Sequence, residues 1–121
     1  MGYFFDSYAI IEIVKGNPNY EKFSGVDFIT NSLNLAEVYY YLLKESDEYI
    51  ASDMLKKFNF EFIEIDPKTA VDSAIFRFRN KKSKLSYADC IGYVLAKENN
   101  LLFLTGDKEF ENLFNVEFVK K

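Results

Sequence analysis

Short apolar runs alternate with segments of helical periodicity along the chain, and this alternation limits its possible folds more than any other feature. The runs occupy residues 2–5, 26–29, 60–65, 101–104 and 116–119. The first and the fourth are typical of parallel strands that are covered on both faces. Apolar residues at helical spacing lie between the runs, and residues 47–58 add a second helix before the third strand. This order predicts right-handed crossovers and a mostly parallel α/β sheet sandwiched by helices.

The composition limits the chemistry that such a fold can carry. A chain of 121 residues without a Pro- or Ser-rich linker is expected to form one domain, spanning 1–121. Cys90 is the only cysteine and histidine is absent, which excludes a disulfide framework, serine-triad and papain-like catalysis and the common zinc sites. Catalysis would therefore depend on carboxylates, hydroxyls, Lys or Arg, and oxygen ligands of this kind favour Mg²⁺ or Mn²⁺.

Charge and hydropathy bear on location and partners. No stretch has the apolar length of a membrane span, and the N-terminus lacks the features of a signal peptide, so we expect a cytoplasmic protein with no membrane partner. The net charge of −4 argues against general nucleic-acid coating. The basic residues are nevertheless uneven, and a phosphate-facing patch is one interpretation of the cluster Arg77, Arg79, Lys81, Lys82 and Lys84. A solvated helix end is the other.

Four acids lie at or just past the start of a predicted helix: Asp6, Glu37, Asp89 and Asp107. Asp6 directly follows the first strand, and Asp107 closely follows the fourth. In open parallel sheets, ligands bind beyond the carboxyl ends of the strands. We therefore expect these carboxylates to meet at that edge.

Each acid, taken alone, also fits a helix cap. Asp6 and Asp107 precede predicted helical turns, while Glu37 follows Asn34 and Asp89 follows Ser86 at the spacing of a capping box. Convergence would be costly without a counter-charge, because two carboxylates about 5 Å apart repel by on the order of 3 kcal/mol at an effective dielectric near 20. A divalent cation is the natural compensation.

The residues around these acids match a known family. The chain resembles PIN-domain ribonucleases, and specifically the VapC-like toxins of prokaryotic toxin–antitoxin pairs, over essentially its whole length. The matching segments are Tyr3-Phe4-Phe5-Asp6-Ser7, Asn34-Leu35-Ala36-Glu37-Val38, Leu85-Ser86-Tyr87-Ala88-Asp89-Cys90 and Leu104-Thr105-Gly106-Asp107-Lys108-Glu109-Phe110. Two positions depart from the usual pattern: Gly106 replaces a larger polar or basic residue, and Glu109 replaces Asp.

The resemblance implies a three-layer α/β/α fold with a central five-stranded parallel sheet. It also implies an endoribonuclease that depends on Mg²⁺ or Mn²⁺, forms a homodimer and is silenced by a cognate antitoxin. The four acids fall at the family's active-site positions, and Ser7 and Thr105 fall where the family often has a hydroxyl. The expected products carry a 5′-phosphate and a 3′-hydroxyl.

We hypothesise that Asp6, Asp89 and Asp107 bind one or two divalent ions, with Glu37 completing the cluster directly or through water. Ser7 and Thr105 would orient ligands or a phosphate, or would simply bond to nearby backbone. Glu109 is a further acid with no assigned metal role.

Two alternatives belong to other classes. A receiver-type signalling domain also gathers acids around Mg²⁺ beyond strand ends, but Glu37 within a helix does not suit it. A non-catalytic PIN-like domain would bind RNA or protein, although four mutually repelling acids have little use without a metal. RNA cleavage by the purified protein separates these alternatives from the nuclease.

Overall fold

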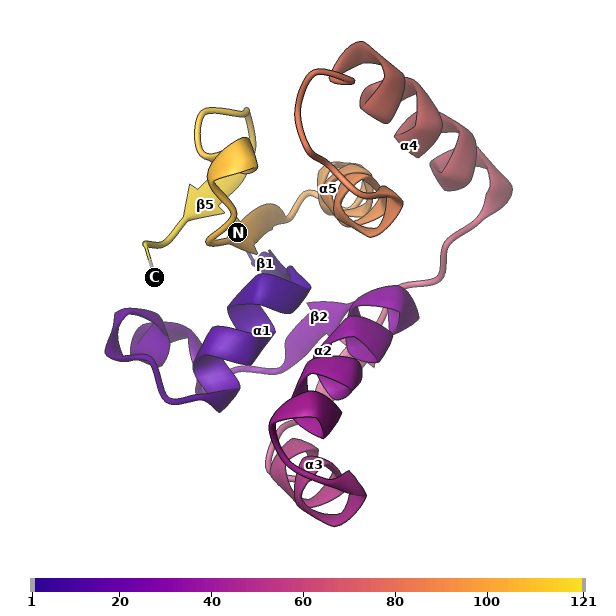
Figure 1. Ribbon diagram of the computed structural model, residues 1–121. Helices are drawn as coiled ribbons and strands as arrows, with labels where there is room; N and C mark the ends of the chain where they lie inside the picture. Colours follow the sequence, from indigo (N-terminus) through magenta and orange to yellow (C-terminus); the bar gives the residue numbers. More distant parts are fainter. Residues whose placement is uncertain (1, 121) are drawn as a thin grey trace.

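The computed structural model describes residues 2–120, and the expected domain limits, 1 and 121, lie outside them. The strands are β1 (Tyr3–Phe5), β2 (Phe28–Thr30), β3 (Phe60–Phe62), β4 (Leu102–Thr105) and β5 (Val116–Phe118). The α-helices are α1 (Ser7–Val14), α2 (Ser32–Glu45), α3 (Glu48–Leu55), α4 (Pro67–Arg79) and α5 (Tyr87–Glu98). Two 3-10 helices, η1 (Pro18–Phe23) and η2 (Lys108–Phe110), complete the elements (Figure 1). Strands and helices therefore alternate as the sequence predicts.

The strands separate two hydrophobic clusters because successive side chains point to opposite faces. Phe4 pairs in register with Phe103, and both pack against α5. Phe5 pairs with Leu104, and both pack on the other face against α1 and α2. Figure 1 shows the result, with α4 and α5 on one side of the strands and α1, α2 and α3 on the other. The predicted α/β/α layering is confirmed.

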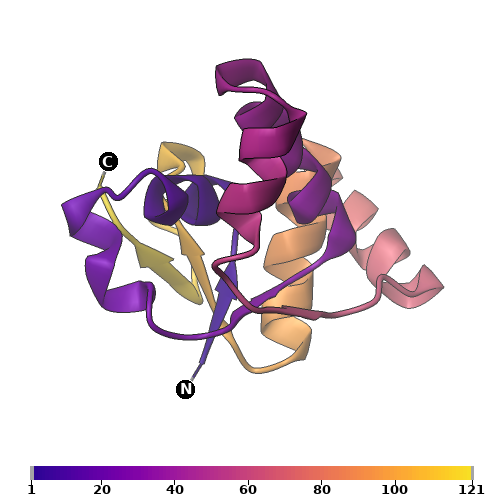
Figure 2. The same ribbon diagram turned by 90° about the horizontal axis from the view of Figure 1, so that it is seen from below.

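The prediction of one central five-stranded sheet is wrong. All strand pairs are parallel, but they form a three-stranded sheet in the order β1-β4-β5 and a separate two-stranded sheet of β2 and β3. Figure 2 shows β1, β4 and β5 as neighbouring arrows. Strands β1 and β2 lie side by side, yet the Phe5 carbonyl accepts a hydrogen bond from the Thr30 hydroxyl at 2.8 Å. A side chain thus occupies a backbone acceptor at this junction, and no backbone ladder joins the two sheets within residues 2–120.

Local capping fixes where the helices begin. Asp47 caps α3 and Asp66 caps α4, each through a side-chain oxygen that accepts a backbone N–H three residues later. Pro67 suits the first turn of α4 because no N–H is needed there. Across the described residues 2–120, no helix has both the length and the apolar character to cross a bilayer.

Candidate metal centre

Asp6 lies at the carboxyl end of β1, caps α1 and is only 2% exposed. Its Oδ1 accepts a hydrogen bond from the Ser7 backbone N–H at 2.9 Å, and its Oδ2 accepts one from the Thr105 hydroxyl at 2.7 Å. Burial raises the pKa of Asp6 to about 8. The Thr105 bond opposes this rise, whereas the charges of Asp89 and Glu37 add to it. The pKa of Asp6 thus reflects both a water-poor position and nearby acids.

Glu37 lies in the second turn of α2, and the capping alternative for it is wrong. Asn31 caps this helix, because its side-chain oxygen accepts the Asn34 N–H at 2.8 Å and starts the helix at Ser32. Glu37 Oε1 instead accepts a hydrogen bond from the Ser7 hydroxyl at 2.9 Å. Partial burial raises the pKa of Glu37, the Ser7 bond lowers it, and the charge of Asp89 raises it. Because the side chain is still exposed, water moderates these effects.

Asp89 completes the capping box of α5, as the capping alternative predicts, but it is also part of the acidic group. Ser86 and Asp89 form a full capping box, with Asp89 Oδ2 accepting the Ser86 N–H at 2.9 Å and Ser86 Oγ accepting the Asp89 N–H at 3.1 Å. Partial burial raises the pKa of Asp89, the Ser86 bonds lower it, and the charge of Asp107 raises it again. The cap therefore fixes the carboxylate at a place where it is close enough to feel the charge of Asp107.

Asp107 follows β4 and is tied to Asp6 through Thr105. The Thr105 hydroxyl, which donates to Asp6, accepts the Asp107 backbone N–H at 3.0 Å. Asp107 also caps η2, where its Oδ1 accepts the Glu109 N–H at 3.0 Å. Glu109 Oε1 accepts the Lys84 N–H at 3.2 Å. The Glu109 side chain therefore braces the loop before α5.

These contacts and charges bring the four acids into one neighbourhood. The side chains do not form a ready-made cage, because no three His, Cys, Asp or Glu residues within 2–120 are arranged to hold a metal ion. The donor set nevertheless fits a hard divalent cation, since it consists of carboxylate oxygens, and burial and neighbouring acids raise the pKa values of Asp6, Glu37 and Asp89. Binding would therefore require side-chain movement.

The sequence reasoning missed a groove beside Asp107. Its volume is about 680 Å³, and it is lined by Tyr8, Gly106, Asp107, Lys108, Glu111, Phe118 and Lys120. Its aromatic and charged lining comes from segments distant in the sequence, and no short motif indicates it. Tyr8 directly follows the Asp6-Ser7 pair, and this position next to a candidate site residue is the one hint of the groove in the sequence.

Two tyrosines explain why this chain has Gly106 where the family pattern has a larger residue. A Cβ at this position would collide with the Tyr20 hydroxyl and with the Tyr8 ring. Tyr20 is fully buried, and its hydroxyl donates to the Val119 carbonyl at 2.8 Å. The two tyrosines therefore occupy the space that a larger residue would need.

Replacing Gly106 by Ala is expected to lower the free energy of unfolding by about 1–3 kcal/mol, as overpacking does. Gly25 is a matched control, because a Cβ there would have no atom within 4 Å. Urea unfolding of both variants measures the difference. Equal stability of Gly106→Ala and Gly25→Ala would contradict the proposed clash.

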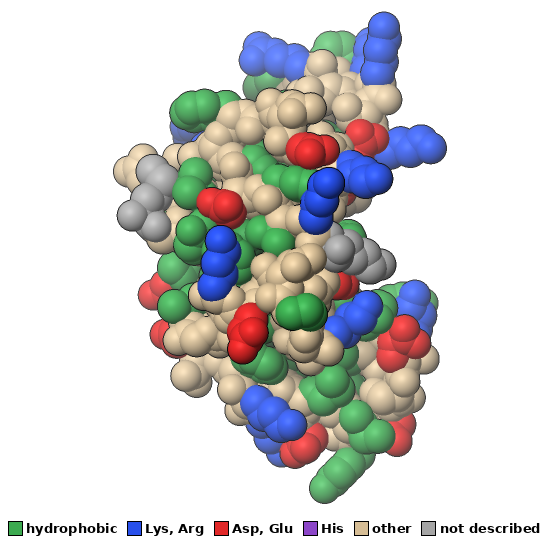
Figure 3. Space-filling model, turned by 90° about the vertical axis from the view of Figure 1, so that its left-hand side faces the viewer, with side chains coloured by type: hydrophobic (Ala, Val, Ile, Leu, Met, Phe, Trp, Pro, Cys, Tyr) green, Lys and Arg blue, Asp and Glu red, His purple; other side chains and the backbone are tan. Residues whose placement is uncertain are grey.

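The basic cluster between residues 77 and 84 does not lie on one groove. Arg77 and Lys81 line one groove, whereas Arg79 lines another together with Lys68 and Lys97. Lys82 and Lys84 are exposed in the loop that follows α4. In Figure 3, basic side chains gather at the top, at the height where α4 ends in Figure 1, and elsewhere on that face acids and bases are interspersed. Three of the five cations are thus divided between two grooves.

Comparison with known proteins places this geometry in a family. The model of the PIN domain family matches residues 3–114. No match is found among curated protein sequences. A toxin–antitoxin complex from Klebsiella pneumoniae is 22% identical, with 96% of each chain covered and a TM-score of 0.73.

Two further solved structures share the fold over nearly the whole chain. VapBC2 from Rickettsia felis, bound to a DNA fragment from their promoter, is 18% identical, with 99% of this chain and 100% of that chain covered and a TM-score of 0.78. VapC20 from Mycobacterium tuberculosis, a toxin that cleaves the sarcin–ricin loop, is 12% identical, with coverages of 98% and 99% and a TM-score of 0.77. The chain therefore belongs to the PIN domain family, and its structural neighbours are VapC and VapBC toxin–antitoxin proteins.

Proposed function

We propose that the chain is a divalent-metal-dependent endoribonuclease and the toxin of a VapBC-type pair, acting on RNA in the cytoplasm. The observation that carries this proposal is the position of Asp6. A carboxylate that is 2% exposed, whose pKa is raised to about 8 by burial and whose nearest charges are other acids, has no cationic partner in its described contacts. A site of this kind favours a bound cation.

Asp6, Asp89 and Asp107 would hold Mg²⁺ or Mn²⁺, with Glu37 completing the set directly or through water. Such a cation lowers the pKa of bound water and stabilises charge on an attacked phosphodiester. The chain's own hydroxyls keep the ligands in place. Thr105 holds one Asp6 oxygen and the Asp107 backbone, and Ser7 holds Glu37. Hydrolysis would leave a 5′-phosphate and a 3′-hydroxyl.

The proposal is tested by incubating purified protein with RNA in Mg²⁺ or Mn²⁺ and in excess EDTA. Cleavage with either ion and none in EDTA is the expected result, with 5′-phosphate ends on the products. A non-catalytic PIN-like domain would bind RNA without cutting it. A receiver-type domain, which the family assignment does not support, would instead take phosphate from a small phosphodonor.

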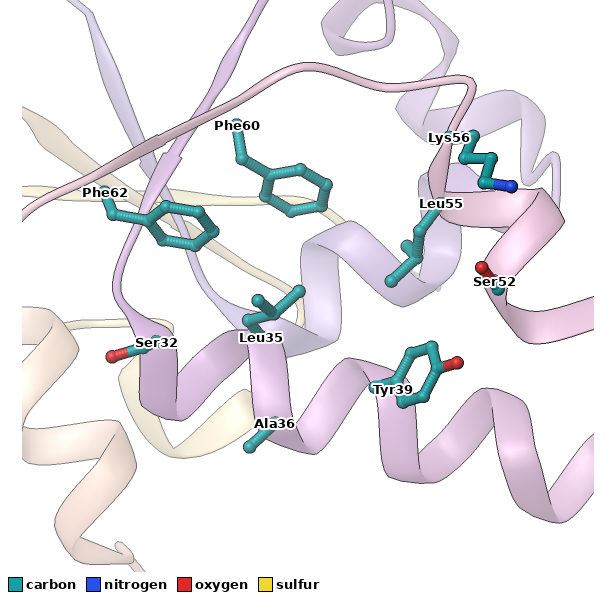
Figure 4. A pocket seen from close by; sticks show the side chains of 9 residues that line it. All are labelled: Ser32, Leu35, Ala36, Tyr39, Ser52, Leu55, Lys56, Phe60 and Phe62. Atoms are coloured by element: carbon teal, nitrogen blue, oxygen red, sulfur yellow. The ribbon is translucent and has the colours of Figure 1, made fainter. Parts of the chain in front are cut away.

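An apolar groove supports the antitoxin part of the proposal. It has a volume of about 650 Å³ and lies between α2, α3 and β3, with Leu35, Tyr39, Leu55, Phe60 and Phe62 directed toward it (Figure 4). Phe62 is 48% exposed although it is a large apolar residue. Because proteins of this fold are seen in complexes with antitoxins, we propose that an apolar antitoxin segment covers this groove.

Replacing Phe62 by Ser is expected to weaken antitoxin binding by roughly 30-fold or more, as loss of an interface anchor does, while RNA cleavage stays intact. The partner to use is the cognate antitoxin, to be sought as the product of a small open reading frame directly upstream, and calorimetry measures its affinity. Tyr49→Ser is the control, because Tyr49 is 82% exposed and lies outside the groove. Equal affinity of the two variants would place the antitoxin elsewhere.

We also propose a homodimer. Val71 and Ile75, one turn apart on α4, are 59% and 41% exposed, which suits an interface. Sedimentation equilibrium of the purified chain measures the oligomeric state directly.

A further inference from the structure

The groove lined by Arg77 and Lys81 lies where the end of α4 meets the loop that leads into α5. Its volume is about 370 Å³. Two aromatic side chains on it are largely exposed, with Tyr87 at 53% and Phe78 at 69%. Two cations, Arg77 and Lys81, line it as well. We call this surface the Tyr87 groove, defined by Arg77, Phe78, Lys81 and Tyr87.

The Tyr87 ring is part of a fixed stack. Arg77 Nε donates to the Leu85 carbonyl at 3.0 Å, and Leu85 is only 5% exposed. The guanidinium carbon of Arg77 lies 4.3 Å from the centre of the Tyr87 ring. The anchored guanidinium therefore supports the ring from one side, and the exposed part of the ring is already oriented before any ligand binds.

A second cation–aromatic pair lies on the α4 side of the groove. Lys81 Nζ lies 4.7 Å from the centre of the Phe78 ring. Exposed rings that alternate with cations are the pattern by which proteins bind single-stranded nucleic acid, because bases stack on the rings and phosphates pair with the cations. An apolar protein segment would instead have to remove water from two charges, which is costly.

The groove and the candidate metal centre share the first turn of α5. Tyr87 is the first residue of α5, and Asp89 lies two residues further on in the same turn. The capping box between Ser86 and Asp89 holds this turn in one conformation. Because residues two apart on a helix point to different sides, a strand with its scissile phosphate at the acids would have to pass around this turn to bring a nearby nucleotide to the Tyr87 ring.

We propose that the Tyr87 groove binds an unpaired nucleotide of the RNA that flanks the scissile bond. The base stacks on the exposed Tyr87 ring, the next base stacks on Phe78, and Lys81 and Arg77 pair with the phosphates. This inference rests on the proposed ribonuclease function. It adds aromatic stacking, and it selects two of the five cations of the basic stretch.

The test uses a short single-stranded RNA that carries 2-aminopurine, in EDTA so that no cleavage occurs. Tyr87→Ala is expected to weaken binding about fivefold or more and to reduce the fluorescence quenching that stacking produces. Tyr87→Phe is expected to bind like the wild type, because stacking needs the ring rather than the hydroxyl. Lys81→Ala should weaken binding and make it less dependent on salt.

Phe114→Ala is the matched control, because Phe114 is 80% exposed and lies outside the groove. Equal affinity of Tyr87→Ala and Phe114→Ala would overturn the proposal, as would loss of binding in Tyr87→Phe. If Phe78→Ala changes the oligomeric state but not RNA affinity, the groove is a protein interface and the proposal is wrong. Wild-type binding that depends on Tyr87, without cleavage in Mg²⁺ or Mn²⁺, would instead refute the nuclease and leave the nucleotide site standing.

Discussion

Replacing Asp89 by Asn is expected to reduce metal-dependent RNA cleavage by at least about 100-fold, and Asp6→Asn should do the same. Loss of residues that only support metal ligands already costs about 10–100-fold, so loss of a ligand should cost no less. The amide oxygen of Asn can still accept the Ser86 N–H, so the capping box should survive in Asp89→Asn. Single-turnover cleavage at saturating Mn²⁺ measures the loss.

Asp47→Asn is the matched control for this prediction. Asp47 is also a helix-capping Asp, since its side chain accepts the Ile50 N–H at 2.9 Å, but it belongs to α3 and to none of the hydrogen bonds around the acids. This variant should cleave RNA at the wild-type rate. Metal-dependent cleavage that persists in both Asp6→Asn and Asp89→Asn would eliminate the proposed site.

The metal-free protein is expected to lose stability as pH rises from about 4 to about 8, and Asp6→Asn should remove most of this loss. The pKa of Asp6 is raised from 3.8 to about 8 in the folded chain, so the folded state binds the proton more tightly than the unfolded state. The contribution of Asp6 to the free energy of unfolding is fully present below about pH 4. It falls as pH rises from about 4 to about 8 and stays low above that. A shift of this size corresponds to on the order of 5 kcal/mol.

Urea unfolding in EDTA at pH 5 and pH 8.5 measures the effect. Asp6→Asn should be the more stable protein at pH 8.5, and Mg²⁺ should stabilise the wild type more at pH 8.5 than at pH 5, because the cation binds the ionised carboxylates. Asp47→Asn should follow the wild type at both values. A wild type that is equally stable at both pH values in EDTA would show that Asp6 is not held in a water-poor site.

Much of the fold could be predicted because it follows from local patterns. The apolar runs 2–5 and 101–104 became β1 and β4, and the helical period within 47–58 became α3. Boundaries were less predictable. Asn31, rather than Asn34, caps α2, because its side chain already accepts a backbone N–H.

The break between the two sheets could not be predicted from local pattern. At the break, the Thr30 hydroxyl donates to the Phe5 carbonyl, and these two residues are far apart in the sequence. Strand propensity carries no information about a side chain that donates a hydrogen bond to a backbone carbonyl of a neighbouring strand. The groove beside Asp107 was unpredictable for the same reason. Two of its lining residues, Tyr8 and Phe118, are far apart in the sequence and come together only in the folded chain.

Within the candidate site, the sequence indicated the acids and the hydroxyls of Ser7 and Thr105, but not which carboxylate each hydroxyl would bind. The Ser86 and Asp89 capping box is readable from three-residue spacing. The bonds from Thr105 to Asp6 and from Ser7 to Glu37 cross between elements, so they required the fold. Both hydroxyls donate to carboxylates, whereas the motif alone does not decide between a carboxylate and the backbone as their acceptor.

The most direct test of the central claim is the location of Mn²⁺ in crystals of the chain, measured by anomalous diffraction. We predict a peak with carboxylate oxygens of Asp6, Asp89 and Asp107 at metal-ligand distances of about 2.0–2.6 Å or bridged by water, and loss of that peak in Asp6→Asn. Anomalous density at other residues only, or an unchanged peak in Asp6→Asn, would contradict the account.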